Sequence, residues 1–146
     1  MSALGYARAT NDIDYLVDGD YAAAVEQGFR QHGFTVFHRT NETLQLEGAG
    51  PIDILFANRP MSKDMLTRCG AIRILDVPVL DAADLIGLKI QAYRDNPRRF
   101  HGDFADIQRL IDANPQLDRK RVEDYARLFD EWERIRPLLD DNGGAR

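Results

Sequence analysis

Three aspartates in strand-like apolar surroundings are the residues of this sequence best suited to chemistry. Asp12 and Asp14 stand two positions apart in "NDIDYLV", and Asp53 lies between two isoleucines in "PIDILFA". Residues two apart on a strand point to one face, roughly 6.6 Å from each other. Two carboxylates this close repel each other unless a divalent cation lies between them. A third carboxylate on a neighbouring strand would complete a site for two Mg²⁺ or Mn²⁺ ions, roughly 3.5–4 Å apart.

A structural interpretation of the same acids stays open. An Asp-x-Asp pair can also mark a strand edge at which both carboxylates are solvated. The second apolar strand with its own acid favours the metal site over this alternative. Other acids stand at the ends of expected elements, where acids commonly cap helices or face solvent. These are Asp18, Asp20, Asp76 and Asp81.

Hydrophobic patterning predicts the elements that position these acids. The first half of the chain alternates short strands with helices, and the second half is helical. This order predicts an α+β protein, with a small β-sheet followed by a helical C-terminal half. Expected strands are 12–18, 34–39, 43–48 and 52–57, with an extended segment at 71–80; expected helices are 19–33, 61–70, 81–95, 101–114 and 118–141.

Length and composition fit one compact domain. The chain has 146 residues, of which 44% are hydrophobic. We expect a single domain over 1–140, sheet-rich over 1–80 and helical over 81–140, with a flexible tail at 141–146. No membrane span or signal segment is apparent, and Cys69 is the only cysteine, which favours a cytoplasmic protein without a membrane partner. The net charge of -5 argues against non-specific nucleic-acid binding.

Charged residues interrupt two apolar helix faces in the second half. Lys89 falls inside the apolar arc of its helix, Asp103 falls inside the arc of the next helix, and Asp106 lies just outside it. A lysine in that place must extend to solvent or meet an anion. Two interpretations stay open: an ion pair between Lys89 and Asp103 that joins the helices, or a contact from Lys89 to nucleotide phosphate. The two acids would then be structural supports for the lysine.

Other patterns predict packing rather than chemistry. The three histidines have no metal-ligand spacing with Cys69, so we expect ordinary surface or core positions for them. Ala22, Val25 and Phe29, with Ala24, are expected to form the inward stripe of the first helix. Asp18 or Asp20 is the expected cap of this helix, and Gly33 is its expected stop. A stripe in the last helix predicts core or helix–helix contacts, at Val122, Tyr125, Phe129, Trp132 and Ile135.

The acidic motifs resemble those of the nucleotidyltransferase superfamily that includes DNA polymerase beta. The similarity is to its small bacterial branch of minimal nucleotidyltransferases and abortive-infection-type toxins. It covers residues 3 to about 112, including the helical segment "VPVLDAADLIGLKIQAYRDNPRRFHGDFADIQRLI". The family pattern R-x-T-x-D-I-D, followed later by a strand with a third acid, matches Arg8, Thr10, Asp12, Asp14 and Asp53.

The resemblance implies a small mixed β-sheet of the nucleotidyltransferase type. It also implies a metal-dependent transfer of NMP from an NTP to a hydroxyl of RNA or protein. Asp12, Asp14 and Asp53 would be the catalytic and metal-binding residues, with Mg²⁺ or Mn²⁺ as the cofactor. Arg8, Thr10 and Lys89 would bind the substrate; for Arg8, pairing with an acid stays open as well.

The sequence departs from the family pattern at its start. Family members carry a Gly-Gly or Gly-Ser turn before the D-I-D strand, and this turn binds the triphosphate. Only "MSALGY" and one further residue precede Arg8, so we expect the first helix, one core strand and the turn to be missing. Either the start of the sequence is set too late or the protein is a natural fragment. The open sheet edge left by a missing strand predicts a homodimer or an assembly in which two chains exchange an element.

Three other functions remain as alternatives. The first is a catalytically inactive nucleotidyltransferase-fold protein that binds a partner, for example in a toxin–antitoxin system. The second is an Asp-x-Asp glycosyltransferase, for which the chain is short. The third is a metal-dependent nuclease, which lacks the expected lysine close after Asp53, where the sequence continues "ILFANR".

Overall fold

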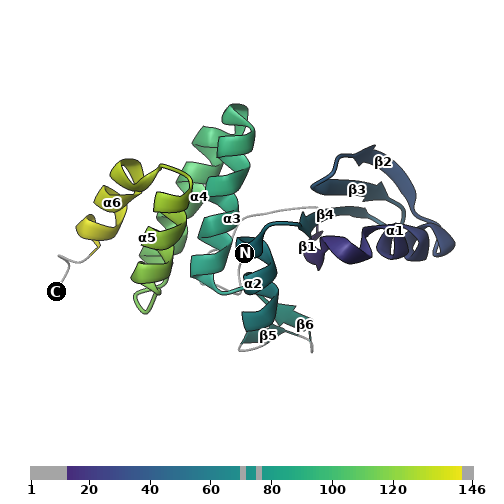
Figure 1. The fold of residues 1–146 in the computed structure, drawn as a ribbon, viewed down its shortest axis with the longest axis horizontal. Helices are drawn as coiled ribbons and strands as arrows, with labels where there is room; N and C mark the ends of the chain where they lie inside the picture. The colour runs from purple at the N-terminus through teal and green to yellow at the C-terminus, as the bar shows by residue number, and fades with distance from the viewer. Residues whose placement is uncertain (1–12, 70–71, 75–76, 143–146) are drawn as a thin grey trace. The chain divides into compact units, whose positions relative to one another are not determined.

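The computed structural model describes residues 13–69, 72–74 and 77–142 (Figure 1). Strands dominate the first half of this part of the chain and helices dominate the second half. The predicted α+β class with a mixed sheet and a helical C-terminal half is therefore confirmed. None of the helices in the described ranges is long and apolar enough to cross a membrane.

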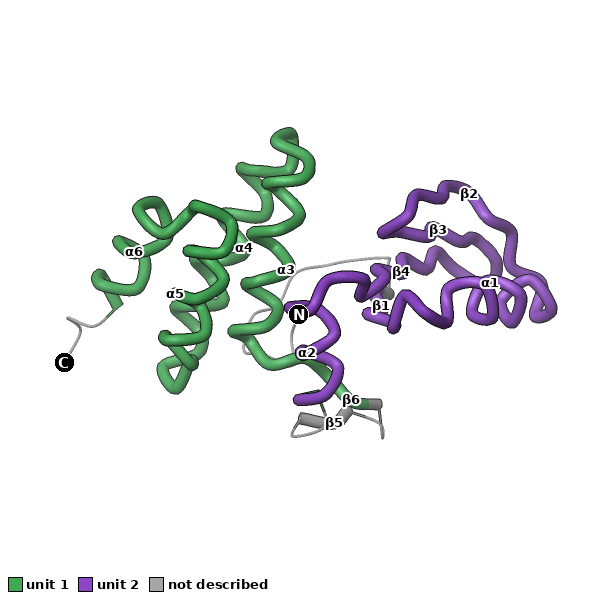
Figure 2. Tube along the Cα trace, viewed as in Figure 1, with its two compact units in different colours: residues 1–8, 69–146 green, residues 9–68 purple. Residues whose placement is uncertain are grey.

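The described residues separate into two compact units (Figure 2). Unit 2 contains the described residues up to Arg68, and unit 1 contains those from Cys69 onward. The sheet-rich part was expected to reach residue 80, but the strands after Arg68 group with the helices. The expectation of a single domain over 1–140 stays a prediction.

Unit 2 is built on a four-stranded mixed sheet. The strands follow the order β1-β4-β3-β2, in which β1 and β4 are parallel and the other neighbours are antiparallel. The strands are β1 Ile13–Asp18, β2 Thr35–Arg39, β3 Thr43–Glu47 and β4 Pro51–Ala57; the helices are α1 Ala22–Gln31, after a 3₁₀ turn at Gly19–Tyr21, and α2 Pro60–Arg68.

One face of this sheet forms the core of unit 2 together with α1. Strand alternation sends every second residue of β3 and β4 to this face. Helix α1 contributes Ala22, Val25 and Phe29, as predicted. Ala24 was predicted to face inward too, but it is exposed because it lies about 200° around the helix from Ala22. The buried residues of the sheet are Leu44, Leu46, Ile54 and Phe56.

The ends of α1 follow the predicted signals. Asp18 caps the 3₁₀ turn that precedes α1, because its carboxylate accepts a hydrogen bond of 2.9 Å from the backbone N–H of Asp20, and α1 itself begins after Tyr21 without a side-chain cap. This bond, helped by Lys63 of α2, lowers the pKa of Asp18 against a smaller opposing effect of desolvation. After the helix, Gly33 adopts a φ of 87°, which is unfavourable for residues with a side chain. Of the two expected caps, Asp18 makes the capping bond, to the 3₁₀ turn and not to α1, and the expected stop at Gly33 is confirmed.

Unit 1 combines a short hairpin with four helices. Helix α3 packs against α4 and α5, and α6 packs against α4 and α5. Asp81 caps α3 as predicted, since its carboxylate accepts a hydrogen bond of 2.9 Å from the N–H of Asp84. The elements are β5 Ile72–Ile74, β6 Val77–Val79, α3 Ala82–Asp95, α4 Phe100–Ala113 after a 3₁₀ turn at Pro97–Arg99, α5 Arg119–Leu128 and α6 Trp132–Asp141.

The prediction of one continuous helix over 118–141 is wrong. The chain breaks between α5 and α6, where Asp130 adopts a φ of 58° and the N–H of Glu131 bonds to the carbonyl of Ala126 at 2.7 Å. Glu131 is only 5% exposed, and its carboxylate accepts hydrogen bonds from Tyr93, Arg94 and Arg134. These donors hold the carboxylate at the corner. The packing predicted for Val122, Tyr125 and Ile135 is confirmed, since all three are buried.

Gly87 of α3 lies against the ring of Tyr125. A Cβ added at Gly87 would come within 2.5 Å of Cδ2 of that ring. We expect Gly87→Ala to lower the free energy of unfolding by about 1–3 kcal/mol, because the helices must move apart. Gly102→Ala is the matched control. Its Cβ would meet nothing within 4 Å, so the better helix former should raise stability by about 0.5–1 kcal/mol. Urea denaturation measures both, and equal effects would contradict the close contact.

Candidate functional site

Two of the three predicted acids lie side by side in the sheet of unit 2. Asp14 on β1 is the direct register partner of Asp53 on β4. Partners on neighbouring parallel strands point to the same face, and their strands run about 4.8 Å apart. The structure therefore brings Asp14 and Asp53 together on one face of the sheet, as the metal-site interpretation requires.

Apolar burial on the opposite face fixes this orientation. Ile54 follows Asp53 in the strand and is 2% exposed among the residues that pack against α1. Because strand residues alternate between faces, Asp53 must point away from α1. Asp14 obeys the same rule, because Val17, three residues later, packs on the α1 side. The local pattern of an acid between β-branched residues thus places both carboxylates outside the core.

The surroundings of the two acids suit a cation. Asp14 is exposed and Asp53 is partly buried. In the part of the chain that the structure describes, the carboxylate of Asp14 has no hydrogen-bond or ion-pair partner. Two like charges on adjacent strands repel each other, and a divalent cation removes that penalty. Carboxylate oxygens are also the ligands that Mg²⁺ prefers, so the donor set fits the predicted metal.

The rest of the predicted metal and substrate set lies outside the described residues. This holds for Asp12, Arg8 and Thr10. Among the described residues, no group of three His, Cys, Asp or Glu side chains is placed to hold a metal ion. Asp14 and Asp53 supply two carboxylates, and the third ligand predicted from the sequence is Asp12. The structure therefore locates two of the three predicted acids, and the complete three-acid site stays a prediction.

Two polar residues that the sequence analysis did not select continue the line of acids. Gln45 on β3 is the register partner of Asp53, and His38 on β2 is the register partner of Gln45. Gln45 stands between two buried leucines in "TLQLE", which is the same alternation that exposes Asp53. That pattern could have identified Gln45. His38 could not be found in this way, because a β-bulge shifts the register of β2.

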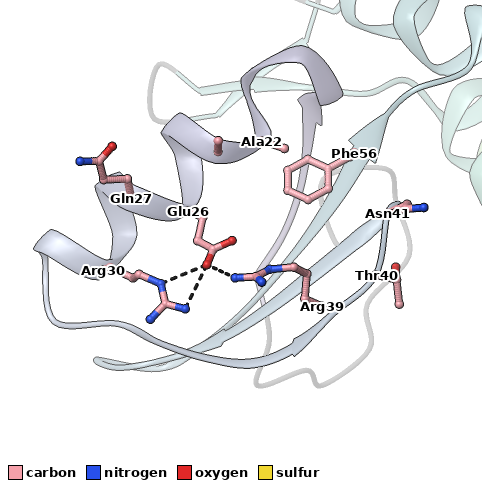
Figure 3. A pocket seen from close by; sticks show the side chains of 9 residues that line it. Ala22, Glu26, Gln27, Arg30, Arg39, Thr40, Asn41 and Phe56 are labelled. Atoms are coloured by element: carbon pink, nitrogen blue, oxygen red, sulfur yellow. Dashed lines mark hydrogen bonds and ion pairs between the residues drawn. The ribbon is translucent and has the colours of Figure 1, made fainter.

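A groove of about 560 Å³ opens on the α1 side of the same unit (Figure 3). The Glu26 carboxylate accepts hydrogen bonds from Arg30 within α1 and from Arg39 of β2, and Phe56 lines the groove as well. Desolvation would raise the pKa of Glu26, but the two guanidinium groups outweigh it and hold this pKa below its usual value. Glu26 is therefore a fixed anion that ties the helix to the sheet.

The predicted ion pair between Lys89 and Asp103 is present in unit 1. Lys89 Nζ lies 3.3 Å from Asp103 and 2.8 Å from Asp106. Asp106 was expected just outside the apolar arc, yet it is 2% exposed. It is buried because Lys89 reaches it from α3, and Arg99 similarly pairs with Asp103 at 2.9 Å. The ion-pair interpretation is confirmed, while a contact from Lys89 to phosphate stays a prediction.

Comparison with models of protein families finds no family that matches the chain, and a search of curated proteins finds no significantly similar sequence. The candidate function is therefore supported by the geometry of the described residues and by the motifs in the sequence.

The buried cluster around Lys89 can be tested by removing its central charge. Lys89→Met keeps the length of the side chain but leaves two buried carboxylates without their shared cation. We expect it to lower the free energy of unfolding by about 3–5 kcal/mol, measured by urea denaturation. Lys120→Met is the matched control, because Lys120 pairs with Asp124 on an exposed helix face, and its urea midpoint should stay unchanged. Equal effects of the two variants would contradict the structural role of Lys89.

Proposed function

We propose that the protein is a metal-dependent nucleotidyltransferase that transfers NMP from an NTP to a hydroxyl group of RNA or protein. The observation that carries this proposal is the register of β1 and β4, which sets Asp14 beside Asp53. The D-I-D and I-D-I motifs support it from the sequence. The type of reaction is taken from the resemblance to the polymerase-beta-like superfamily.

In this proposal Asp14, Asp53 and Asp12 hold Mg²⁺ or Mn²⁺. The bound ions would offset the negative charge of the triphosphate and favour ionisation of the acceptor hydroxyl. Asp53 lies on the same face of the sheet as Asp14, and its carboxylate would accept the proton of that hydroxyl. The hydroxyl oxygen then forms a bond to the α-phosphorus, the bond to the β-phosphate oxygen breaks, and pyrophosphate leaves.

Two residues of the family pattern complete the proposed substrate site. Arg8 and Thr10 precede the metal strand in sequence and would contact the phosphates.

The proposal is tested by incubating the protein with α-labelled NTPs, Mg²⁺ or Mn²⁺, and total cell RNA or lysate. We expect transfer of label, reduced by roughly 100-fold or more in Asp14→Asn and in Asp53→Asn, because each variant removes a charge that holds the metals. Asp64→Asn is the matched control, since Asp64 is an exposed acid on α2 of the same unit. It should retain wild-type transfer. Activity that survives the double variant Asp12→Asn plus Asp14→Asn would refute the assignment.

The proposal includes a homodimer. Strand β1 is the terminal strand of the sheet that the described residues form, and such an edge favours pairing with another chain. Light scattering at micromolar concentration should give twice the mass of one chain. A monomer under these conditions would remove the dimer from the proposal and leave the assignment of the acids untouched.

A further inference from the structure

The line of polar residues across unit 2 extends well beyond the two acids. Asp14, Asp53, Gln45 and His38 are successive register partners on β1, β4, β3 and β2. Neighbouring strands lie about 4.8 Å apart, so the line spans about 14 Å. An extended nucleoside triphosphate has a comparable length.

A β-bulge decides what stands at the far end of this line. Val36 pairs with Leu46, but the next pair is His38 with Gln45, so the register shifts between them. Without the shift, His38 would face Leu44 on the α1 side. The bulge instead sets Phe37 and His38 together opposite Gln45. Bulges of this kind re-aim side chains and are common next to active sites.

The bulge leaves a large aromatic side chain in solvent. Phe37 is 77% exposed, the highest value among the large hydrophobic residues described as exposed. The side chains of Gln45 and His38 have no hydrogen-bond partner in the described part of the chain. Core packing therefore does not explain this group, which presents an aromatic ring, an imidazole and an amide with free donors and acceptors.

We infer that Phe37, His38 and Gln45 form the nucleoside subsite of the proposed nucleotidyltransferase, with the base stacked on Phe37. The inference rests on the proposed function, because the acids and their metals must hold the phosphates at the other end of the line. Aromatic rings bind bases through their π-face with little dependence on base identity. A glutamine amide can both donate to and accept from a base edge. His38 follows Phe37 in the edge strand β2 and is the register partner of Gln45.

A comparison of two ligands tests this subsite. The full chain is titrated with Mn²⁺, then with Mn²⁺ plus inorganic tripolyphosphate, and separately with Mn²⁺ plus each of ATP, GTP, CTP and UTP. We expect Phe37→Ala to weaken nucleoside triphosphate binding by about 5- to 100-fold, and Gln45→Ala by about 3- to 10-fold. Binding of tripolyphosphate should be unchanged in both, because it has no nucleoside.

Controls separate this inference from the proposed function. Tyr21→Ala removes another exposed aromatic ring of unit 2, which is 63% accessible. It should leave the binding of tripolyphosphate and of nucleoside triphosphates unchanged. Asp14→Asn should weaken the binding of Mn²⁺, of tripolyphosphate and of the nucleoside triphosphates.

The possible outcomes separate the two proposals. Nucleotide affinity that is unchanged in Phe37→Ala, while Mn²⁺ binding still needs Asp14, would overturn the subsite alone. A wild-type chain that binds no Mn²⁺ would overturn both proposals. A change of mass in Phe37→Ala without a change in nucleotide binding would assign the ring to a protein contact and overturn the subsite.

Discussion

The register between β1 and β4 is the constraint on which the candidate chemistry depends. It is set by the apolar residues that pack against α1, not by the acids themselves. Ile54 and Phe56 must reach the core, and strand alternation then sends Asp53 to the other face, beside Asp14. A slip of one residue would bury Asp53 and expose Ile54, at a cost in both hydrophobic and charge desolvation free energy. The hydrophobic core thus positions two like charges that would otherwise separate.

The two faces of this sheet have different physical roles. The α1 side contains the buried cluster of Leu44 and Leu46, and Glu26 ties the helix to the strand through Arg39. The other side presents polar groups in line across all four strands. Only the bulge in β2 departs from simple alternation, and it exposes Phe37 to place His38 in the line. Exposing an apolar ring to water is unfavourable. A bulge that does so indicates a functional role for the side chains whose direction it changes.

Unit 1 shows how buried charge can organise helices without carrying out chemistry. Lys89 lies between Asp103 and Asp106, and the Glu131 carboxylate accepts hydrogen bonds from Tyr93 and two arginines. Burial and the contact with Glu131 together raise the pKa of Tyr93, so its hydroxyl remains a donor. Each of these carboxylates would be costly if left alone in the interior. The pairs therefore fix which faces of the helices meet, and they account for charged residues that interrupt apolar stripes.

The sequence by itself determined the order and type of nearly all elements, because apolar spacing and caps such as Asp81 and Gly33 act within a few residues. It also selected Asp14 and Asp53, since an acid between strand-forming apolar residues has to face away from the core. It did not determine the break at Asp130, where the stripe from Val122 to Ile135 continues without interruption; the buried bonds of Glu131 decide that corner. Nor did it determine that His38 lines up with Gln45. Pairing across strands depends on contacts between distant residues, and a single bulge changes it without leaving a periodic signal in the chain.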